Sequence, residues 1–199
     1  MKKFVVVILM TFVLATFSFA EMPVNHNATL IPPKASLVSG GFDNGFNAAY
    51  LEYTHGLKGT NLHVKLSAGR RIFQAQGLVR HCILEWSGID MGFGYGGEFT
   101  LQNGRWWEVT PMASWHMSHK FTADVDFYGG VLSGFSFGKD FWGGFAEVPV
   151  GIYYGTQIDI AKNLELYAEL QTGILNHKSS AFFGVNYYIA KGIEAPKKK

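Results

Sequence analysis

A histidine and a serine are spaced as a catalytic pair in the segment His116-Met117-Ser118. Successive side chains of a strand point to opposite faces, so a His-x-Ser pair on a strand has both side chains on one face, about 7 Å apart at the Cα level. Asp124 and Asp126 follow closely and would supply a carboxylate. A base, a nucleophile and an orienting acid form an acyl-transfer site. The pattern therefore permits a hydrolase that uses His116, Ser118 and Asp126.

The same spacing occurs again at His177-Lys178-Ser179, in a segment expected to be a loop, so the pair arises readily by chance. The seven histidines of the chain include no HExxH motif or similarly tight spacing of metal ligands. We therefore expect no metal and no cofactor.

The segment around residues 90–101 shows the kind of element that must position these residues. Its large apolar side chains fall in one phase of a period-two alternation, and its glycines and acids fall in the other. Glycine is costly in a strand, whereas small residues make room in a narrow lumen. The pattern indicates a barrel with lipid outside. The apolar set is Met91, Phe93, Tyr95, Phe99 and Leu101; the opposing set is Asp90, Gly92, Gly94, Gly96, Glu98 and Thr100.

The first twenty residues predict a signal peptide that is cleaved after export. Lys2 and Lys3 precede an apolar run over residues 4–17, and Ser18-Phe19-Ala20 is a small-x-small cleavage site. Without Lys2 and Lys3 the chain has 17 − 2 = 15 basic and 15 acidic side chains, so its formal charge is zero. A neutral chain lacks the strongly basic face that nucleic-acid binding favours, so we expect no nucleic-acid partner. We divide the chain into a signal peptide (1–20), a flexible N-terminal lead (21–34), a barrel (35–190) and a basic C-terminal tail (191–199).

The barrel region divides into short alternating strands joined by turns. Asn44-Gly45 and Asn103-Gly104 are strong hairpin signals. No apolar run after the signal peptide is long enough for a transmembrane helix, so a membrane location requires a closed sheet. We predict an all-β fold, an antiparallel up-and-down transmembrane β-barrel of eight to ten strands, with ten favoured by count. The expected strands lie near residues 35–41, 46–55, 60–69, 77–86, 89–101, 105–118, 122–136, 145–157, 162–173 and 180–190.

Nine ionisable side chains fall on the predicted inner faces. They either line a narrow path for cations or form a structural polar network. Small barrels are filled by their own side chains, so the network is favoured. The nine residues are His63, Lys65, Asp90, Glu98, Glu108, Asp124, Asp126, Glu165 and Glu169.

With both barrel ends in the periplasm, four tryptophans lie near strand ends and predict an aromatic girdle: Trp86, Trp106, Trp107 and Trp115. In the predicted outer loop at 137–144, Phe141 and Trp142 are candidates for surface contact. Arg80 and Cys82 share the phase of Leu78 and Leu84, which predicts that they face lipid. An arginine there requires snorkelling or a bulge that shifts the register.

Two stretches resemble small bacterial outer-membrane barrels, the group that includes OmpX- and Ail-type proteins. The first runs from Trp107-Glu108-Val109 to Ser114-Trp115-His116 and continues at 125–134. The second comprises residues 148–154, 163–170 and 183–188. The resemblance covers roughly residues 89–190 and implies an outer-membrane barrel without naming a substrate. Members usually end on an aromatic residue, whereas here Tyr188 is followed by eleven more residues.

The resemblance to lipid A deacylases is weaker. Their His-x-Ser motif continues with Asn, but this chain has His119. The alternation also turns His116 and Ser118 toward the lumen near the periplasmic end, away from lipid in the outer leaflet. We therefore expect a non-enzymatic protein of the bacterial outer membrane.

The expected role is structural or surface-interactive, in a monomer that contacts outer-membrane lipid and, through its loops, surface ligands. Three alternatives stay open: a narrow ion or solute channel, a lipid A-type acyl hydrolase, and a soluble periplasmic lipocalin-like binding barrel. The last alternative turns the apolar face inward, because alternation alone does not say which face meets water.

Overall fold

The computed structural model describes residues 31–43, 48–140, 142–176 and 179–189. None of these residues belongs to a helix that is long and apolar enough to cross a membrane. Twelve strands make up the described fold: β1 (Ser36–Asp43), β2 (Ala48–Leu57), β3 (Thr60–Gly69), β4 (Ile72–Trp86), β5 (Ile89–Gln102), β6 (Trp106–Lys120), β7 (Val125–Gly134), β8 (Ser136–Asp140), β9 (Gly143–Glu147), β10 (Val150–Ala161), β11 (Leu164–Leu175) and β12 (Ser180–Ile189).

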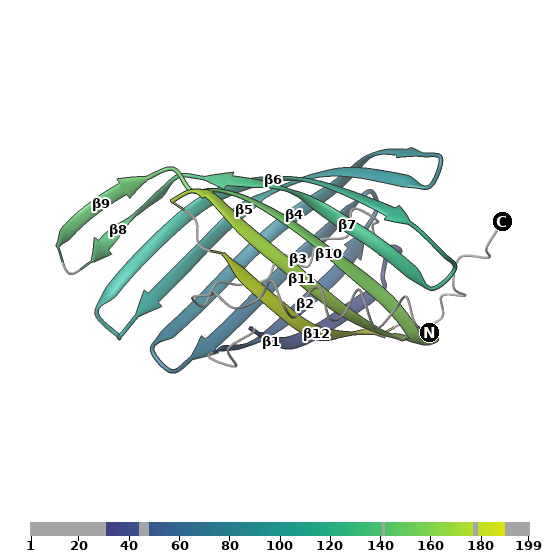
Figure 1. The fold of residues 1–199 in the computed structure, drawn as a ribbon, viewed down its shortest axis with the longest axis horizontal. Helices are drawn as coiled ribbons and strands as arrows, with labels where there is room; N and C mark the ends of the chain where they lie inside the picture. The colour runs from purple at the N-terminus through teal and green to yellow at the C-terminus, as the bar shows by residue number, and fades with distance from the viewer. Residues whose placement is uncertain (1–30, 44–47, 141, 177–178, 190–199) are drawn as a thin grey trace.

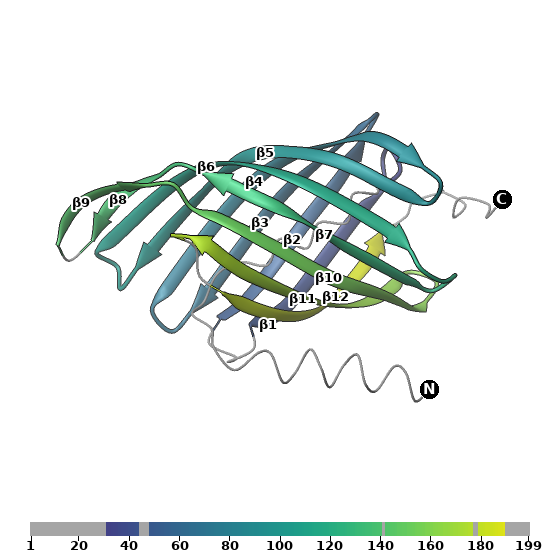
Figure 2. The same ribbon diagram turned by 45° about the horizontal axis from the view of Figure 1, so that its top comes forward.

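Ten of these strands close into an antiparallel barrel (Figures 1 and 2). Each of β1 to β6 pairs with the next strand along the chain, β7 pairs with β10, and β10 to β12 continue the wall. The ring closes where β1 pairs with β12, from Ser36 opposite Ile189 to Asp43 opposite Phe182. The prediction of an antiparallel up-and-down barrel, with ten strands favoured by count, is confirmed.

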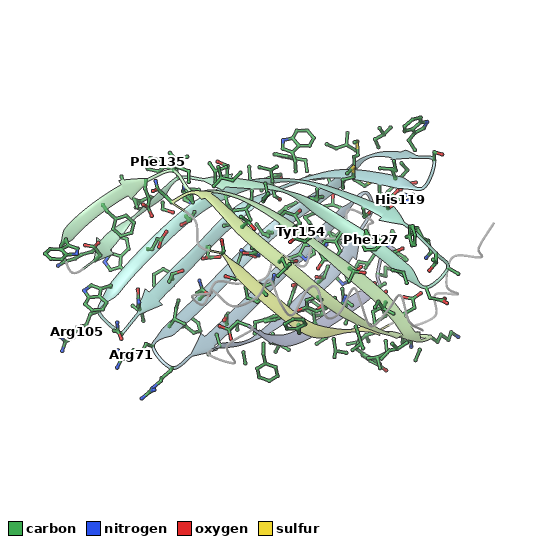
Figure 3. All side chains as sticks on the ribbon, in the orientation of Figure 1. Arg71, Arg105, His119, Phe127, Phe135 and Tyr154 are labelled. Atoms are coloured by element: carbon green, nitrogen blue, oxygen red, sulfur yellow. The ribbon has the colours of Figure 1, made fainter. Side chains whose placement is uncertain are left out.

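The two rims of the barrel differ. Ser36 and Ile189 lie at one rim, called here the terminal rim, together with the turns at 58–59, 87–88, 121–124 and 162–163. The opposite loop rim carries Arg71 and Arg105, whereas His119 lies at the terminal end (Figure 3). The turns of the terminal rim are the shorter set on average, as expected for periplasmic turns.

The predicted outer loop at 137–144 is instead part of a hairpin. β8 pairs with β6 along Trp107 to Val109, and β9 pairs with β8 from Glu147 opposite Ser136 to Gly143 opposite Asp140. The hairpin therefore lengthens the barrel wall on one side of the loop rim (Figure 1). The expected strand at 122–136 is also corrected, because β7 begins only at Val125.

The barrel has its apolar side chains outside and its polar side chains inside. On β2 and β3 the outward Leu51 and Val64 are 58% and 56% exposed, whereas the inward Glu52 and Lys65 are each 1% exposed. This arrangement is opposite to that of a lipocalin-like barrel, whose apolar side chains face inward. The lipocalin-like alternative is therefore wrong for this fold.

Glycines in the wall make room for inward aromatic rings. A Cβ atom at Gly184 would lie 2.5 Å from the hydroxyl oxygen of Tyr50 and 2.6 Å from that of Tyr167. At Gly130 it would lie 2.6 Å from the hydroxyl oxygen of Tyr153. Because packed interiors tolerate little added volume, these glycines hold the inward tyrosines in place.

Gly184→Ala is therefore expected to destabilise the barrel by about 1–3 kcal/mol through overpacking. Gly77→Ala is the matched control, since a Cβ atom there meets nothing within 4 Å. Urea unfolding in detergent micelles, followed by tryptophan fluorescence, measures both variants. Equal stability of the two would contradict the close fit at Gly184.

Residues 31–35 form a turn against the inner wall at the terminal rim. The Lys34 amide donates to the Gly56 carbonyl over 2.9 Å, and the Gly56 amide donates to the Ala35 carbonyl over 3.0 Å. With its side-chain amide oriented to suit both neighbours, Asn61 donates to the Thr60 carbonyl and accepts from the Ile31 amide, each at 3.2 Å. The last residues of the predicted N-terminal lead (21–34) thus form a bonded turn. The predicted signal peptide and tail lie outside the described residues.

Candidate functional site

The centre of the lumen holds a cluster of charged side chains from three neighbouring strands. Glu52 and Thr54 lie on β2, His63 and Lys65 on β3, and Arg80 on β4. The strand register sets Glu52 opposite Lys65 and Thr54 opposite His63. The Glu52 carboxylate accepts from Thr54 Oγ1 at 3.0 Å, lies 2.8 Å from His63 Nδ1, and pairs with Lys65 Nζ at 3.1 Å.

The hydrogen bonds also fix the tautomer of His63. Arg80 Nε donates to His63 Nε2, so the ring proton of a neutral His63 lies on Nδ1 and is donated to Glu52. All five members of the cluster are at most 5% exposed. Buried charges are stable only when they are paired and hydrogen-bonded, so we interpret the cluster as a fixed electrostatic core.

An aromatic wall lies across the lumen. Tyr128, Leu132 and Tyr153 form a buried apolar cluster on β7 and β10. The Tyr128 hydroxyl donates to Glu169 Oε2 over 3.1 Å, and Gln171 Nε2 donates to Glu169 Oε1 over 2.9 Å. Tyr153 is 2% exposed and Glu169 is 1% exposed, so solvent does not reach this wall.

The nine side chains predicted to fill the lumen do not all lie at the same depth. His63, Lys65 and Glu169 are buried at its centre. Asp124 is exposed in the turn before β7, which corrects its assignment to the lumen. A lumen position for Asp124 requires that β7 includes residue 124, but β7 begins at Val125. The partly buried members are Asp90, Glu98, Glu108, Asp126 and Glu165.

Sequence reasoning missed the two residues on which the cluster depends most. Glu52 follows the same alternation as its neighbours, and phasing residues 48–57 would have placed it inside. The lipid-facing prediction for Arg80 is wrong: Arg80 and Leu78 both point inward and are 5% exposed. A register shift between Cys82 and Leu84 reverses the alternation, as the bulge considered for Arg80 requires.

The catalytic candidates occupy a closed part of the wall. His116 and Ser118 face inward on β6, and each is 4% exposed. Ser114 Oγ lies 3.5 Å from His116 Nδ1. In the strand register Asp126 lies opposite Lys120, which is two residues nearer the terminal rim than Ser118. Asp126 Oδ1 lies 3.9 Å from Lys120 Nζ. Side chains buried in this way are not open to lipid.

A pocket of about 240 Å³ lies at the loop rim, on the inner side of the wall that the β8–β9 hairpin extends. Glu108, Gly138 and Phe145 are cross-strand neighbours there, in register from β6 through β8 to β9. A Cβ atom at Gly138 would lie 3.1 Å from the Phe145 ring, so a larger residue at this position would press on the ring. We call this pocket the vestibule. Its lining residues are Thr100, Gln102, Trp106, Trp107, Glu108, Lys139, Asp140, Phe145 and Glu147.

Three of the four predicted girdle tryptophans point outward. Trp86, Trp107 and Trp115 are 69%, 39% and 59% exposed. Trp106 is corrected: it shares the inward phase of Glu108 and lines the vestibule. At the tip of the hairpin Trp142 is 88% exposed. Its predicted partner Phe141 lies outside the described residues.

Solved outer-membrane proteins have similar folds. The COG4313 outer membrane channel from Pseudomonas putida F1 is 7% identical, with a TM-score of 0.49 over 85% of this chain and 99% of the channel. The KdgM porin is 11% identical, with a TM-score of 0.44 over 77% of this chain and 98% of the porin. A loop-deleted OmpT of Vibrio cholerae is 13% identical, with a TM-score of 0.40 over 80% of this chain and 60% of OmpT.

No model of a known protein family matches the sequence, and no curated protein matches it. The likenesses to solved structures concern barrel architecture alone. The narrower resemblance to OmpX- and Ail-type barrels stays a prediction. The fold is that of an antiparallel ten-stranded barrel with an apolar exterior and a charged, buried interior.

Proposed function

We propose that this protein is a bacterial outer-membrane barrel with a closed lumen, that it serves a structural and surface-contact role, and that it performs no catalytic step. The observation that carries the proposal is the reversal of polarity across the wall. Outward side chains such as Leu51 and Trp115 are apolar and exposed, whereas the inward Glu52, Lys65 and Glu169 are each 1% exposed.

The exterior supports a membrane location. A soluble protein rarely exposes a continuous apolar surface of this extent. A closed sheet satisfies its backbone hydrogen bonds within the wall, as a lipid environment demands. Export by the predicted signal peptide would bring the chain to the envelope, where the outward tryptophans match the interfacial aromatic residues of such barrels.

The interior supports a closed lumen over a channel. In a water-filled pore the lining side chains are wet. Here side chains on opposite walls, such as Lys65 and Tyr153, are 1% and 2% exposed. The polar side chains bond to one another, as in barrels that are filled by their own residues. This packing favours a structural network over an ion path.

The loop rim supports a contact role. The β8–β9 hairpin projects from the wall (Figure 2). Trp142 lies between these two strands and is exposed. Asp140 Oδ1 accepts from the amides of Trp142 and Gly143, at 2.7 and 3.0 Å, which holds the backbone of these two residues against Asp140. A fixed, exposed indole is a suitable anchor for a surface partner.

The proposal is tested by fractionation and by cysteine labelling in a Cys82→Ala background. The expressed protein should be recovered in the outer membrane and should migrate differently on gels before and after boiling. A membrane-impermeant maleimide should label Trp142→Cys in intact cells. It should label Lys58→Cys, at the terminal rim, only after lysis.

Recovery in the soluble periplasm would overturn the membrane location. The reverse labelling pattern would place the hairpin in the periplasm and overturn the contact role. Both cysteine positions are exposed, so a difference between them reports orientation rather than burial.

A further inference from the structure

We propose that the vestibule is a binding site for a small organic cation that carries an ammonium group. The inference deepens the proposed contact role and rests on it, because it assigns the chemistry of a ligand at the loop rim. Its basis is the combination of a cavity, aromatic walls and an excess of carboxylates on one face of the β6–β8–β9 wall.

The cavity is built by the sheet register. Gly138 stands between Glu108 and Phe145, and a Cβ atom at this position would lie 2.9 Å from Glu108 Cα. Glu108 and Phe145 therefore lie on the same face of the wall, on either side of Gly138. Trp106 borders the same space. A pocket of about 240 Å³ admits a small ligand but not a folded partner.

The charges of the lining select a cation. Glu108, Asp140 and Glu147 contribute three negative charges and Lys139 contributes one positive charge, so the formal net charge is −3 + 1 = −2. Glu108 Oε1 accepts from Thr110 Oγ1 at 3.1 Å, which fixes that carboxylate against the wall. An anionic ligand would be repelled by this set of charges.

The rings select an organic cation over a bare metal ion. The face of an aromatic ring attracts alkylammonium groups, and aromatic cages recognise quaternary ammonium in this way. A hard metal ion instead requires several converging oxygen ligands and has no use for an indole or a phenyl wall. Trp106 and Phe145 therefore distinguish the two kinds of cation.

Choline is the probe for the test, and its neutral analogue with carbon in place of nitrogen is the matched control ligand. Calorimetric titration uses the full barrel refolded in a sugar-based detergent, which lacks choline head groups. We expect saturable choline binding that is at least about tenfold tighter than binding of the neutral analogue. Glu108→Gln should weaken choline binding about tenfold, and Phe145→Leu should also weaken it.

Two further variants separate this site from general effects on folding. Lys139→Gln removes the opposing positive charge and should tighten choline binding, a gain that a damaged fold would not produce. Glu85→Gln removes an exposed acid near the terminal rim and should leave binding unchanged. Each variant is first checked for the heat-dependent gel shift of a folded barrel.

Equal binding of choline and its neutral analogue, or no saturable binding by the wild-type barrel, overturns the inference. The inference is also overturned if Glu108→Gln leaves the affinity for choline unchanged. A barrel that reaches the outer membrane with its hairpin outside, but does not bind choline, overturns this inference and leaves the proposed function standing.

Discussion

Glu52→Gln is expected to lower the free energy of unfolding by about 3–5 kcal/mol, because it removes the carboxylate from a buried cluster of cations. Glu52 contacts Lys65 Nζ at 3.1 Å and His63 Nδ1 at 2.8 Å, and Arg80 reaches the far side of the same imidazole. The loss leaves Lys65, at 1% exposure, without the negative charge that faces it. Urea unfolding of the refolded barrel, followed by tryptophan fluorescence and by gel shift, measures the difference in the free energy of unfolding between this variant and the wild type.

The double variant Glu52→Gln with Lys65→Met distinguishes a charge effect from a loss of shape. Removing both charges should cost less than the sum of the two single changes, because the pair is coupled. Glu85→Gln changes an exposed acid and should stay within about 0.5 kcal/mol of the wild type. Additive losses in the double variant would contradict the assigned ion pair.

Replacing both Tyr128 and Tyr153 by alanine is expected to change a silent barrel into a conducting one. The two rings form the buried aromatic wall with Leu132, and their removal opens space next to the charged cluster. In planar bilayers the wild-type barrel should give no discrete steps in ion conductance over many insertions. The double variant should give measurable conductance steps.

The control for this experiment removes two rings from the outside. Tyr53 and Tyr154 point outward and are 47% and 49% exposed, so their double alanine variant should stay silent. Discrete steps from the wild-type barrel would favour the channel alternative instead. In that case Glu98→Gln or Glu165→Gln should reduce the conductance.

Alternation was sufficient to predict the ring of strands. Between residues 90 and 101 large apolar side chains and glycines separate cleanly, and the structure sets His116 against the space left by Gly92 and Gly94. The same pattern could not decide which face meets water. The prediction that the apolar face meets lipid rested on the glycines of the opposite face, which make room in a narrow lumen, and the exposed Leu51 and Val64 confirm that the apolar face is the outer one.

The errors have different physical causes, and one of them is that a shift of one residue reverses every later side chain. Because of the irregularity after Cys82, Leu84 points outward whereas Arg80, which precedes the irregularity, points inward against expectation. Trp106 was assigned to the girdle with Trp107, although adjacent residues of a strand cannot face the same way. The β8–β9 hairpin was missed because its strands have only five residues each, too few to alternate recognisably.

The seam between β1 and β12 has a consequence for the order in which this molecule forms. The first and the last strand of the barrel are partners, from Ser36 with Ile189 to Asp43 with Phe182. The wall therefore has two open edges until synthesis has delivered its final strand. Pairing between such distant parts of the chain is slow, and unpaired edges invite aggregation. A chain cut before Ser180 would have no way to close, however well its other strands paired.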